Sequence, residues 1–128
     1  MHIAATSAGL AEFRIEEESL GPSARVLIVH GDADLYSAPE LREHVRRAID
    51  GGATTIVVDL SDAAVVDSTS LGVLLAAMRR LREQNGQIRL VVPRAEVRRV
   101  FEITMLDRIF ELYETQEEAL TALSGEAT

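Results

Sequence analysis

The sequence predicts a single α/β domain, a sandwich in which four helices cover a mixed, mostly parallel sheet. The chain has 128 residues, of which 47% are hydrophobic, enough for one domain with its own core. Short apolar runs rich in β-branched residues alternate with segments whose apolar residues recur at helical spacing. The expected order is β-β-α-β-α-β-α-β-α. Strands that are joined through helices pair in parallel by right-handed crossovers, which accounts for the parallel part of the sheet.

The first two strands form a hairpin-like antiparallel pair. Residues 12–18 alternate apolar and charged side chains around Phe13 and Ile15, which is typical of an edge strand whose charges face water. A Gly-Pro turn follows, and 24–31 is a continuous apolar strand.

The first helix is predicted over 38–50. Ser37 and Glu40 have the spacing of a capping box, and Pro39 lies in the first turn, where its missing N–H costs nothing. The glycine pair that begins at Gly51 ends the helix. One helical stripe carries its apolar residues, which are Leu41, Val45, Ala48 and Ile49.

The rest of the chain continues the alternation. Residues 54–60 are a buried strand, β-branched and almost uncharged, and 88–92 and 109–113 are the strands that follow. The last helix begins at a second capping box, formed by Thr115 and Glu118. The two helices between these strands carry apolar stripes, namely Leu71, Leu74, Leu75, Met78 and Leu81, then Val97, Val100 and Phe101.

The composition excludes several classes of function. The formal net charge of −8 repels a phosphate backbone, so nucleic acid is not an expected partner. All 13 side chains in the Lys+Arg total are arginines and there is no cysteine, which excludes lysine Schiff bases, the P-loop lysine, thiol nucleophiles and thiolate metal sites. No apolar stretch could span a bilayer, and the N-terminus lacks the regions of a secretory signal. We expect a cytoplasmic domain over 11–124 without cofactor or direct membrane insertion, and flexible termini at 1–10 and 125–128.

Residues 65–72, VVDSTSLG, place three consecutive hydroxyl side chains between a predicted strand and a predicted helix. Partners of open α/β sheets meet the carboxyl ends of the strands, and a helix start offers unpaired N–H groups and a positive dipole end. A phosphate on one of these hydroxyls would be partly stabilised there. Spacing alone leaves a simpler interpretation open, in which Ser68 is only an N-cap worth about 1 kcal/mol and Thr69 and Ser70 have no further role. Gly72, in the first turn, would let another backbone approach closely.

A nucleophilic serine is disfavoured because the chain lacks a suitable base. Its histidines are His2 in the N-terminal segment, His30 at a strand end and His44 beside an apolar helical stripe. We expect His30 to be structural and His44 to be half-buried. No G-x-S-x-G elbow is present.

Residues 31–42, GDADLYSAPELR, contain the second candidate site. Asp32 and Asp34 would share a face of an extended chain, but two carboxylates without further ligands make a poor metal site. The structural alternative is a pair of loop acids beside a capped helix. Tyr36, exposed next to a helix that starts with proline, would suit a protein interface.

These two segments resemble the motifs of anti-sigma-factor antagonists of the STAS superfamily. Gly31–Asp34, before the first helix, matches the family's G-E/D-x-D, and the DSTSLG of Asp67–Gly72 matches its D-S-S/T-G-L-G. The similarity covers roughly Phe13–Leu123, and the two motifs in this order are a specific signal. The resemblance therefore implies a STAS-like sandwich.

The resemblance also implies a partner switch in transcription regulation. The unphosphorylated antagonist would bind an anti-sigma factor that is also its serine kinase, and would so free a sigma factor. Phosphorylation of the loop would release the antagonist, and a metal-dependent phosphatase of the PP2C type would reset it. The family's acceptor is the hydroxyl directly after the motif aspartate, which is Ser68 here, with Thr69 as runner-up. ATP and magnesium would belong to the kinase, so the chain itself is not expected to be an enzyme.

The family's partner contact falls on both motifs. The implied contact residues are Asp32, Asp34, Tyr36, Asp67, Ser68, Thr69, Ser70, Leu71 and Gly72. Ser70 and Met105 depart from the family, which usually has glycine at both places, and a side chain at 70 restricts the backbone and adds a competing acceptor. A STAS subunit of a membrane transporter or lipid-import complex is the alternative. A small hydrolase or nucleotide-binding domain is disfavoured, because the sequence has no lysine, cysteine, catalytic triad or P-loop.

Overall fold

The computed structural model of the chain describes residues 12–126, and its elements follow the predicted order. The strands are β1 (Arg14–Ser19), β2 (Ala24–His30), β3 (Thr55–Asp62), β4 (Gln87–Val91) and β5 (Glu111–Tyr113). The helices are α2 (Ala38–Asp50), α3 (Ser68–Glu83), α4 (Ala95–Ile103), the 3-10 turn η1 (Leu106–Arg108) and α5 (Gln116–Glu126). The predicted fold class is confirmed. The expected N-terminal segment 1–10 lies outside the described residues, and α5 continues past the expected boundary at 124.

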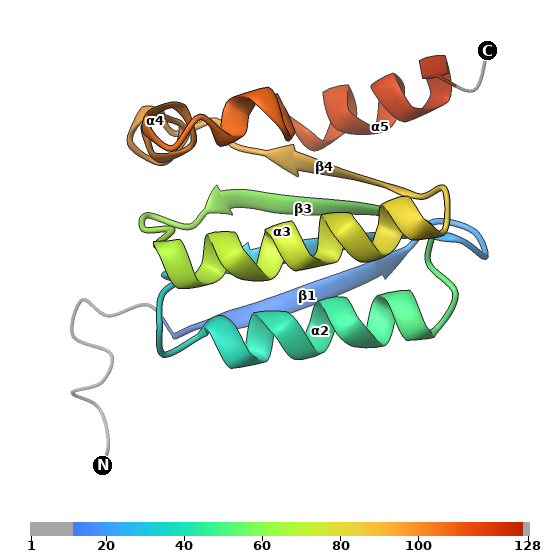
Figure 1. Cartoon of the computed structure of the whole chain (residues 1–128), viewed down its shortest axis with the longest axis horizontal. Helices are drawn as coiled ribbons and strands as arrows, with labels where there is room; N and C mark the ends of the chain where they lie inside the picture. The colour runs from blue at the N-terminus through green and yellow to red at the C-terminus, as the bar shows by residue number, and fades with distance from the viewer. Residues whose placement is uncertain (1–11, 127–128) are drawn as a thin grey trace.

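The sheet has the strand order β1-β2-β3-β4-β5. β1 pairs antiparallel with β2, and every other pair is parallel, as the crossovers predict. The carboxyl ends of β2, β3 and β4 therefore lie at one edge of the sheet, on the left in Figure 1. The loops that carry both sequence motifs leave this edge.

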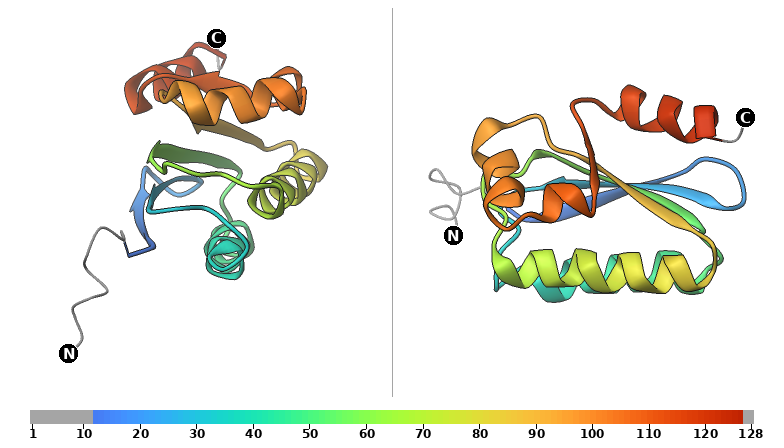
Figure 2. Two further views of the ribbon diagram at one scale, coloured as in Figure 1. Left: turned by 90° about the vertical axis from the view of Figure 1, so that its left-hand side faces the viewer. Right: turned by 45° about the horizontal axis from the view of Figure 1, so that its top comes forward.

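The helices form two unequal layers. α2 and α3 lie side by side on one face of the sheet, and α5 lies on the other (Figures 1 and 2). The main core lies between the sheet and the first layer, and α4 adds Phe101, whose ring meets Phe110 edge-on at 6.1 Å. The second core, under α5, is small and consists of Val26, Val57, Val91 and Ala119. No helix within 12–126 is both long and apolar enough to cross a membrane.

An acidic residue in the middle of β3 holds the last helix against the sheet. Asp59 is only 7% exposed, and its carboxylate accepts hydrogen bonds from the Ser61 N–H at 2.9 Å and from the Gln116 amide at 2.7 Å. Gln116 is the first residue of α5. The strand β3, which the sequence predicts to be apolar, thus has one apolar face and one face with a hydrogen-bonded carboxylate. The small second core under α5 covers little of that second face.

The capping box predicted at Ser37 and Glu40 is wrong. The Ser37 backbone is already helical (φ −96°, ψ −12°), and its side chain makes no capping hydrogen bond. The turn before α2 starts earlier, since the Ala38 N–H donates to the Asp34 carbonyl at 2.8 Å. The second predicted box is confirmed at Thr115, whose hydroxyl accepts from the Glu118 N–H at 3.0 Å.

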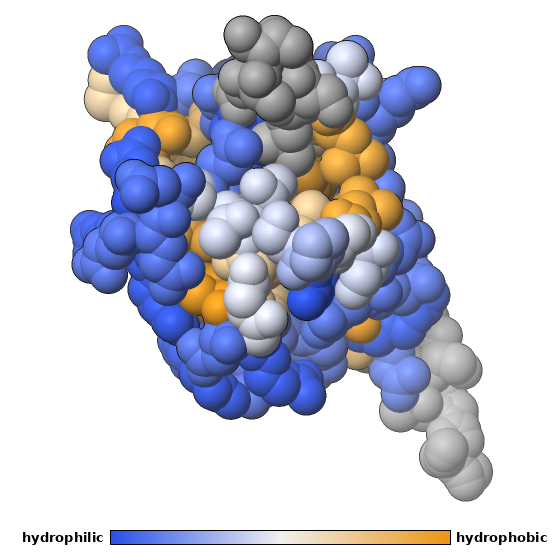
Figure 3. Space-filling model, turned by 90° about the vertical axis from the view of Figure 1, so that its right-hand side faces the viewer, coloured by the Kyte–Doolittle hydropathy of each residue, from blue (hydrophilic) through white to orange (hydrophobic). Residues whose placement is uncertain are grey.

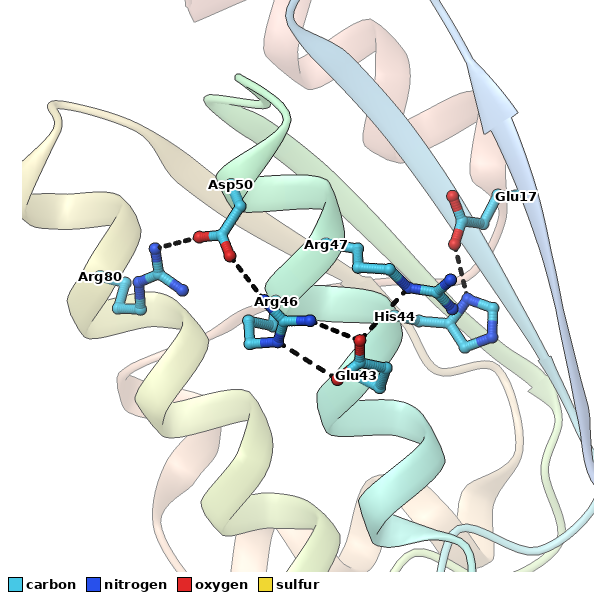
Figure 4. A network of polar contacts seen from close by, with 7 residues as sticks. All are labelled: Glu17, Glu43, His44, Arg46, Arg47, Asp50 and Arg80. Atoms are coloured by element: carbon cyan, nitrogen blue, oxygen red, sulfur yellow. Dashed lines mark hydrogen bonds and ion pairs between the residues drawn. The ribbon is translucent and has the colours of Figure 1, made fainter.

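Two histidines pair with carboxylates of neighbouring elements, contacts that the sequence did not predict. His30 lies between Asp62 of β3, at 2.7 Å, and Glu16 of β1. His44 of α2 is half-buried and pairs with Glu17 of β1 (Figure 4). Both are structural.

An ion-pair network joins α2 to α3 on their exposed side (Figure 4). Asp50 accepts from Arg80 of α3 and from Arg46 of α2, both at 2.8 Å, and Arg46 also pairs with Glu43. The hydrogen bond from Arg80 lowers the pKa of Asp50, and the hydrogen bond from Arg46 lowers the pKa of Glu43. Because both pKa values are lowered in the folded state, the stabilisation is present above the unfolded pKa and is lost as the pH falls through the folded values. Such exposed pairs contribute little, and salt screens them.

Met105 explains why a glycine is common at its position in the family. It follows α4 with φ +62°, in the left-handed region that glycine adopts without cost. The Met105 side chain is 53% exposed, so a methionine in place of glycine strains the backbone of this turn and does not change the packing of the core.

Candidate functional site

The two motif loops lie side by side at the carboxyl edge of the sheet. We call 31–37 the Asp34 loop and 65–72 the Ser68 loop. The Ala33 N–H donates to the Val65 carbonyl at 2.8 Å, and the Asp67 N–H donates to the Ala33 carbonyl at 3.0 Å. These bonds form a parallel bridge beyond the ends of β2 and β3. The juxtaposition expected from the crossover is thus fixed by backbone hydrogen bonds.

Gly31 gives the Asp34 loop its direction. Its φ of +96° is one that residues with a side chain rarely adopt, and a Cβ there would lie 3.0 Å from the Cα of Phe13. The N-terminal end of the described chain therefore runs directly against the start of this loop. Any residue larger than glycine would have to move one backbone away from the other.

The Asp34 side chain and Ser37 hold the loop in shape. The Asp34 carboxylate accepts from the N–H groups of Tyr36 at 3.0 Å and Ser37 at 3.1 Å. The buried Ser37 hydroxyl accepts from the Asp34 N–H at 2.9 Å and donates to the Asp32 carbonyl at 2.7 Å. Asp34 therefore has a structural role as a loop acid, because its carboxylate holds the turn that leads into α2.

The loop presents its apolar residues to solvent. Tyr36 is 89% exposed and Leu35 is 60% exposed, so Tyr36 does not pack on the core. Val65, in the neighbouring loop, is 45% exposed. Sequence reasoning found Tyr36 and missed Leu35 and Val65, although an apolar residue inside a loop of acids and small residues is a usable signal. Leu35 and Tyr36 belong to the loop that is bridged to the Ser68 loop at Ala33.

Asp67, and not Ser68, is the N-cap of α3. Its backbone is extended (φ −101°, ψ 179°), and its carboxylate accepts from the Ser70 N–H at 3.1 Å. The interpretation of Ser68 as a mere N-cap is therefore wrong. Ser68 is the first residue of the helix and is exposed, while Thr69 is half-buried. The Ser68 hydroxyl is accessible and lies at the positive end of a 16-residue helix.

Ser70 is fully buried at 0% exposure, and its hydroxyl has no hydrogen-bond partner among the described residues. Spacing could have shown this burial, since 70, 74, 77 and 81 fall on one helical stripe. Burial removes Ser70 as a competing acceptor in the folded chain. Gly72 is exposed, and a Cβ added to it meets nothing within 4 Å, so no other part of the described chain approaches it closely.

Ser70→Ala is expected to stabilise the chain by about 1 kcal/mol, because it removes a buried hydroxyl that has lost its water and gained no partner. Thermal unfolding of both proteins measures this. Ser68→Ala, at an exposed position of the same turn, is the control and should change the melting temperature little. A Ser70→Ala protein that melts lower would show that the hydroxyl is hydrogen-bonded in the folded state.

Among the side chains that the structure describes, no group of three or more His, Asp or Glu could hold a metal ion. Asp32 and Asp34 do not converge, since the Asp34 carboxylate binds its own loop backbone. The site is thus a surface with an accessible serine hydroxyl, flanking carboxylates and exposed apolar side chains. Such a surface can bind a protein and can change its charge.

A family model for the STAS domain matches residues 19–119, a span that includes both loops. The chain belongs to the STAS domain family. Of the curated STAS relatives, a Thermotoga neapolitana protein provisionally named an anti-sigma factor antagonist is 40% identical over 74 residues, 58% of this chain and 66% of the relative, just under two thirds of its length. The anti-sigma-B factor antagonist of Bacillus subtilis is 33% identical over 84 residues, 66% of this chain and 76% of the relative.

Solved STAS structures have the same fold. An anti-sigma factor antagonist from Mycobacterium paratuberculosis superposes with a TM-score of 0.79 at 28% identity, over 87% of this chain and 93% of the other. SpoIIAA, an anti-sigma factor antagonist solved in its unphosphorylated form, superposes with a TM-score of 0.76 at 26% identity, over 88% and 97%. The phosphorylated form of SpoIIAA, from Bacillus, gives 0.68 at 25% identity, over 86% and 99%. The murine anion transporter Slc26a9, at 18% identity, shares only the fold.

Proposed function

We propose that this STAS protein is an anti-sigma factor antagonist. Its unphosphorylated form binds an anti-sigma factor through the Asp34 and Ser68 loops and so frees a sigma factor. The accessible Ser68 hydroxyl next to the Asp67 cap, on a loop that is bridged to the loop of the exposed Leu35, carries this proposal. Two of the similar proteins are named anti-sigma-B factor antagonist and SpoIIAA, and SpoIIAA is known in unphosphorylated and phosphorylated forms.

Charge at Ser68 is the proposed switch. A neutral hydroxyl can be buried in a protein contact at little cost, whereas a phosphate adds about −1.5 to −2 charges beside Asp67. An unpaired charge buried in an interface is strongly unfavourable. The fold need not change, because the acceptor lies on the contact surface itself. The partner is then both anti-sigma factor and serine kinase, a PP2C-type phosphatase restores the hydroxyl, and the exchange takes place in the cytoplasm.

This assignment gives the chain a binding role. ATP and magnesium are bound by the kinase, and the only chemical step at this chain is transfer of a phosphoryl group to the Ser68 oxygen, with the hydroxyl proton leaving. The geometry supports Ser68 over Thr69, since the Thr69 side chain is half-buried while Ser68 is exposed.

Incubation with ATP and each candidate anti-sigma factor kinase of the source organism, followed by mass spectrometry of the peptides, tests the acceptor. Phosphate is expected on Ser68, and Ser68→Ala is expected to abolish its incorporation while Thr69→Val preserves it. A phosphate confined to Thr69 or Ser70 would contradict the assignment. Absence of phosphate with every such kinase would contradict the proposed switch.

Tyr36→Ala is expected to weaken anti-sigma factor binding by roughly tenfold or more while leaving the melting temperature unchanged, because the ring is almost wholly exposed. Asp34→Ala is expected to weaken binding and also to destabilise the chain by about 1 kcal/mol, because it removes the acceptor of two loop N–H groups. Calorimetric titration and thermal unfolding on the same samples separate the two effects. An unchanged affinity of Tyr36→Ala for the anti-sigma factor would show that the Asp34 loop is not part of the interface.

A further inference from the structure

A second surface lies between α2 and α3 and adjoins the Ser68 loop at Thr69 and Gly72. The two helices leave a groove of about 360 Å³ on their solvent side. Its floor is apolar and consists of the buried Val45, Ile49, Val73 and Ala77. Its rim carries three arginines, Arg42 and Arg46 from α2 and Arg80 from α3, and no carboxylate lines it. Figure 4 shows Arg46 and Arg80 on the two helices with Asp50 between them.

The groove has the length of a short helix. Along α3 its lining runs from Thr69 to Arg80, about 16 Å at the rise of an α-helix. The middle of this wall is made of Gly72 and Ala76, and a Cβ placed on Gly72 meets nothing within 4 Å. Small side chains on one wall let another backbone come close. Three turns of helix fit this length, with apolar residues at i, i+3, i+4 and i+7 facing the floor.

The charge of this face is opposite to that of the rest of the chain. Six of the 13 arginines lie on α2 and α3, against four of the 21 acidic residues, so these helices carry +2 and the remainder −10. The rest of the chain is acidic on balance, so an acidic partner is favoured at this layer. A second copy of the chain, with its own net charge of −8, would bring the same cationic face and an equally concave groove.

We propose that the α2–α3 groove binds an acidic amphipathic helix of a partner protein. Apolar side chains of that helix fill the floor, and glutamates or aspartates on both flanks meet the arginines of the rim. Arg42 is paired with no carboxylate within the described residues and is open to the partner from the start. Arg46 and Arg80 are held in place by exposed ion pairs with Glu43 and Asp50. Exchanging these carboxylates for those of the bound helix costs little free energy, because exposed ion pairs contribute little. This site does not depend on the proposed switch at Ser68.

The probe is a fluorophore-labelled synthetic 14-residue peptide of leucine, alanine and glutamate, with leucines at i, i+3, i+4 and i+7 and glutamates on both flanks. Its binding to the full chain is followed by anisotropy and by amide chemical shifts of the ¹⁵N-labelled chain. Shifts are expected on α2 and α3. Arg42→Glu and Ala76→Asp should each weaken binding about tenfold. Arg79→Glu is the matched control, an equal change of charge at an exposed α3 position outside the groove, and should stay within about twofold.

Four results would overturn the proposal. A scrambled peptide of the same composition that binds equally well would show attraction by charge alone, as would equal losses for Arg79→Glu and Arg42→Glu. Shifts confined to residues outside α2 and α3 would place the peptide elsewhere. A chain that sediments as a dimer, and that Ala76→Asp converts to a monomer, would assign the groove to a second copy. Melting curves of both groove variants keep unfolding apart from lost binding. Arg42 and Ala76 are exposed, so only the small loss of helix propensity at Ala76→Asp, under about 1 kcal/mol, is expected.

Discussion

The chain phosphorylated on Ser68 is expected to bind its anti-sigma factor about a thousandfold more weakly than the unmodified chain, a loss of about 4 kcal/mol. The phosphate enters a proposed contact surface that already contains Asp67 and that also carries the exposed apolar Leu35 and Val65 of the two bridged loops. Part of the charge is offset by the start of α3, which lowers the cost without removing it. Calorimetric titration of both forms against the anti-sigma factor measures the difference.

Substitutions of Ser68 are expected to weaken anti-sigma factor binding to different degrees, according to the charge that they introduce. Ser68→Ala should bind as the unmodified chain does and remain bound in the presence of ATP. Ser68→Asp carries a single charge and should lie between the two forms. Gln84→Asp, at the exposed far end of the same helix, adds an equal charge away from the interface and serves as control. Equal affinities for Ser68→Asp and the unmodified chain, together with an unaffected phosphorylated form, would reject charge as the switch.

Gly31→Ala is expected to destabilise the chain by about 3 kcal/mol and to lower the melting temperature by roughly 10 °C. Its φ of +96° disfavours any side chain, and the new Cβ would press on the Phe13 backbone at 3.0 Å. Because the Asp34 loop starts at this residue, anti-sigma factor binding should fall even at temperatures where the chain is folded. Thermal and urea unfolding measure the first effect and calorimetric titration the second.

Gly52→Ala separates the two causes of that loss. Gly52 has a similar φ of +104° but nothing within 4 Å of an added Cβ, so it reports backbone strain alone, about 1 kcal/mol. The difference between the two variants is the cost of separating the Asp34 loop from the residues before β1. Equal destabilisation by the two substitutions would mean that the contact at Phe13 contributes nothing.

Periodicity was sufficient for the fold because each element has one dominant apolar face. Leu41, Val45 and Ile49 repeat at helical spacing and are all buried, and the β-branched run of β3 is the middle of the sheet. The burial of Asp59 was beyond this reasoning. Its partner Gln116 is 57 residues away, and no local pattern connects a carboxylate in one strand to an amide at the start of the last helix.

The motif residues of the site could be predicted from the sequence, but the structural role of each one could not. Asp67 and Ser68 are both good N-cap residues, and the extended backbone at Asp67 decides between them. Ser37 has the same ambiguity, because its hydroxyl can cap forward or bind the preceding loop, and it does the second. The groove between α2 and α3 depends on the distance between the two helices, and the residue spacing within either helix does not predict that distance.

The turns at the amino ends of the parallel strands are joined to one another by hydrogen bonds. They lie at the opposite end of the sheet from the Ser68 loop. The Thr54 N–H donates to the Ser23 carbonyl at 2.9 Å, and the Gln87 N–H donates to the Thr54 carbonyl at 2.8 Å. Figure 3 shows this end of the molecule, where hydrophilic residues surround small separate apolar areas. The sequence has no cysteine, so one introduced at the exposed Glu83 would be the single thiol in the chain. A dye or a surface tether attached there would leave both loops clear and would allow the exchange of partners to be followed on individual molecules.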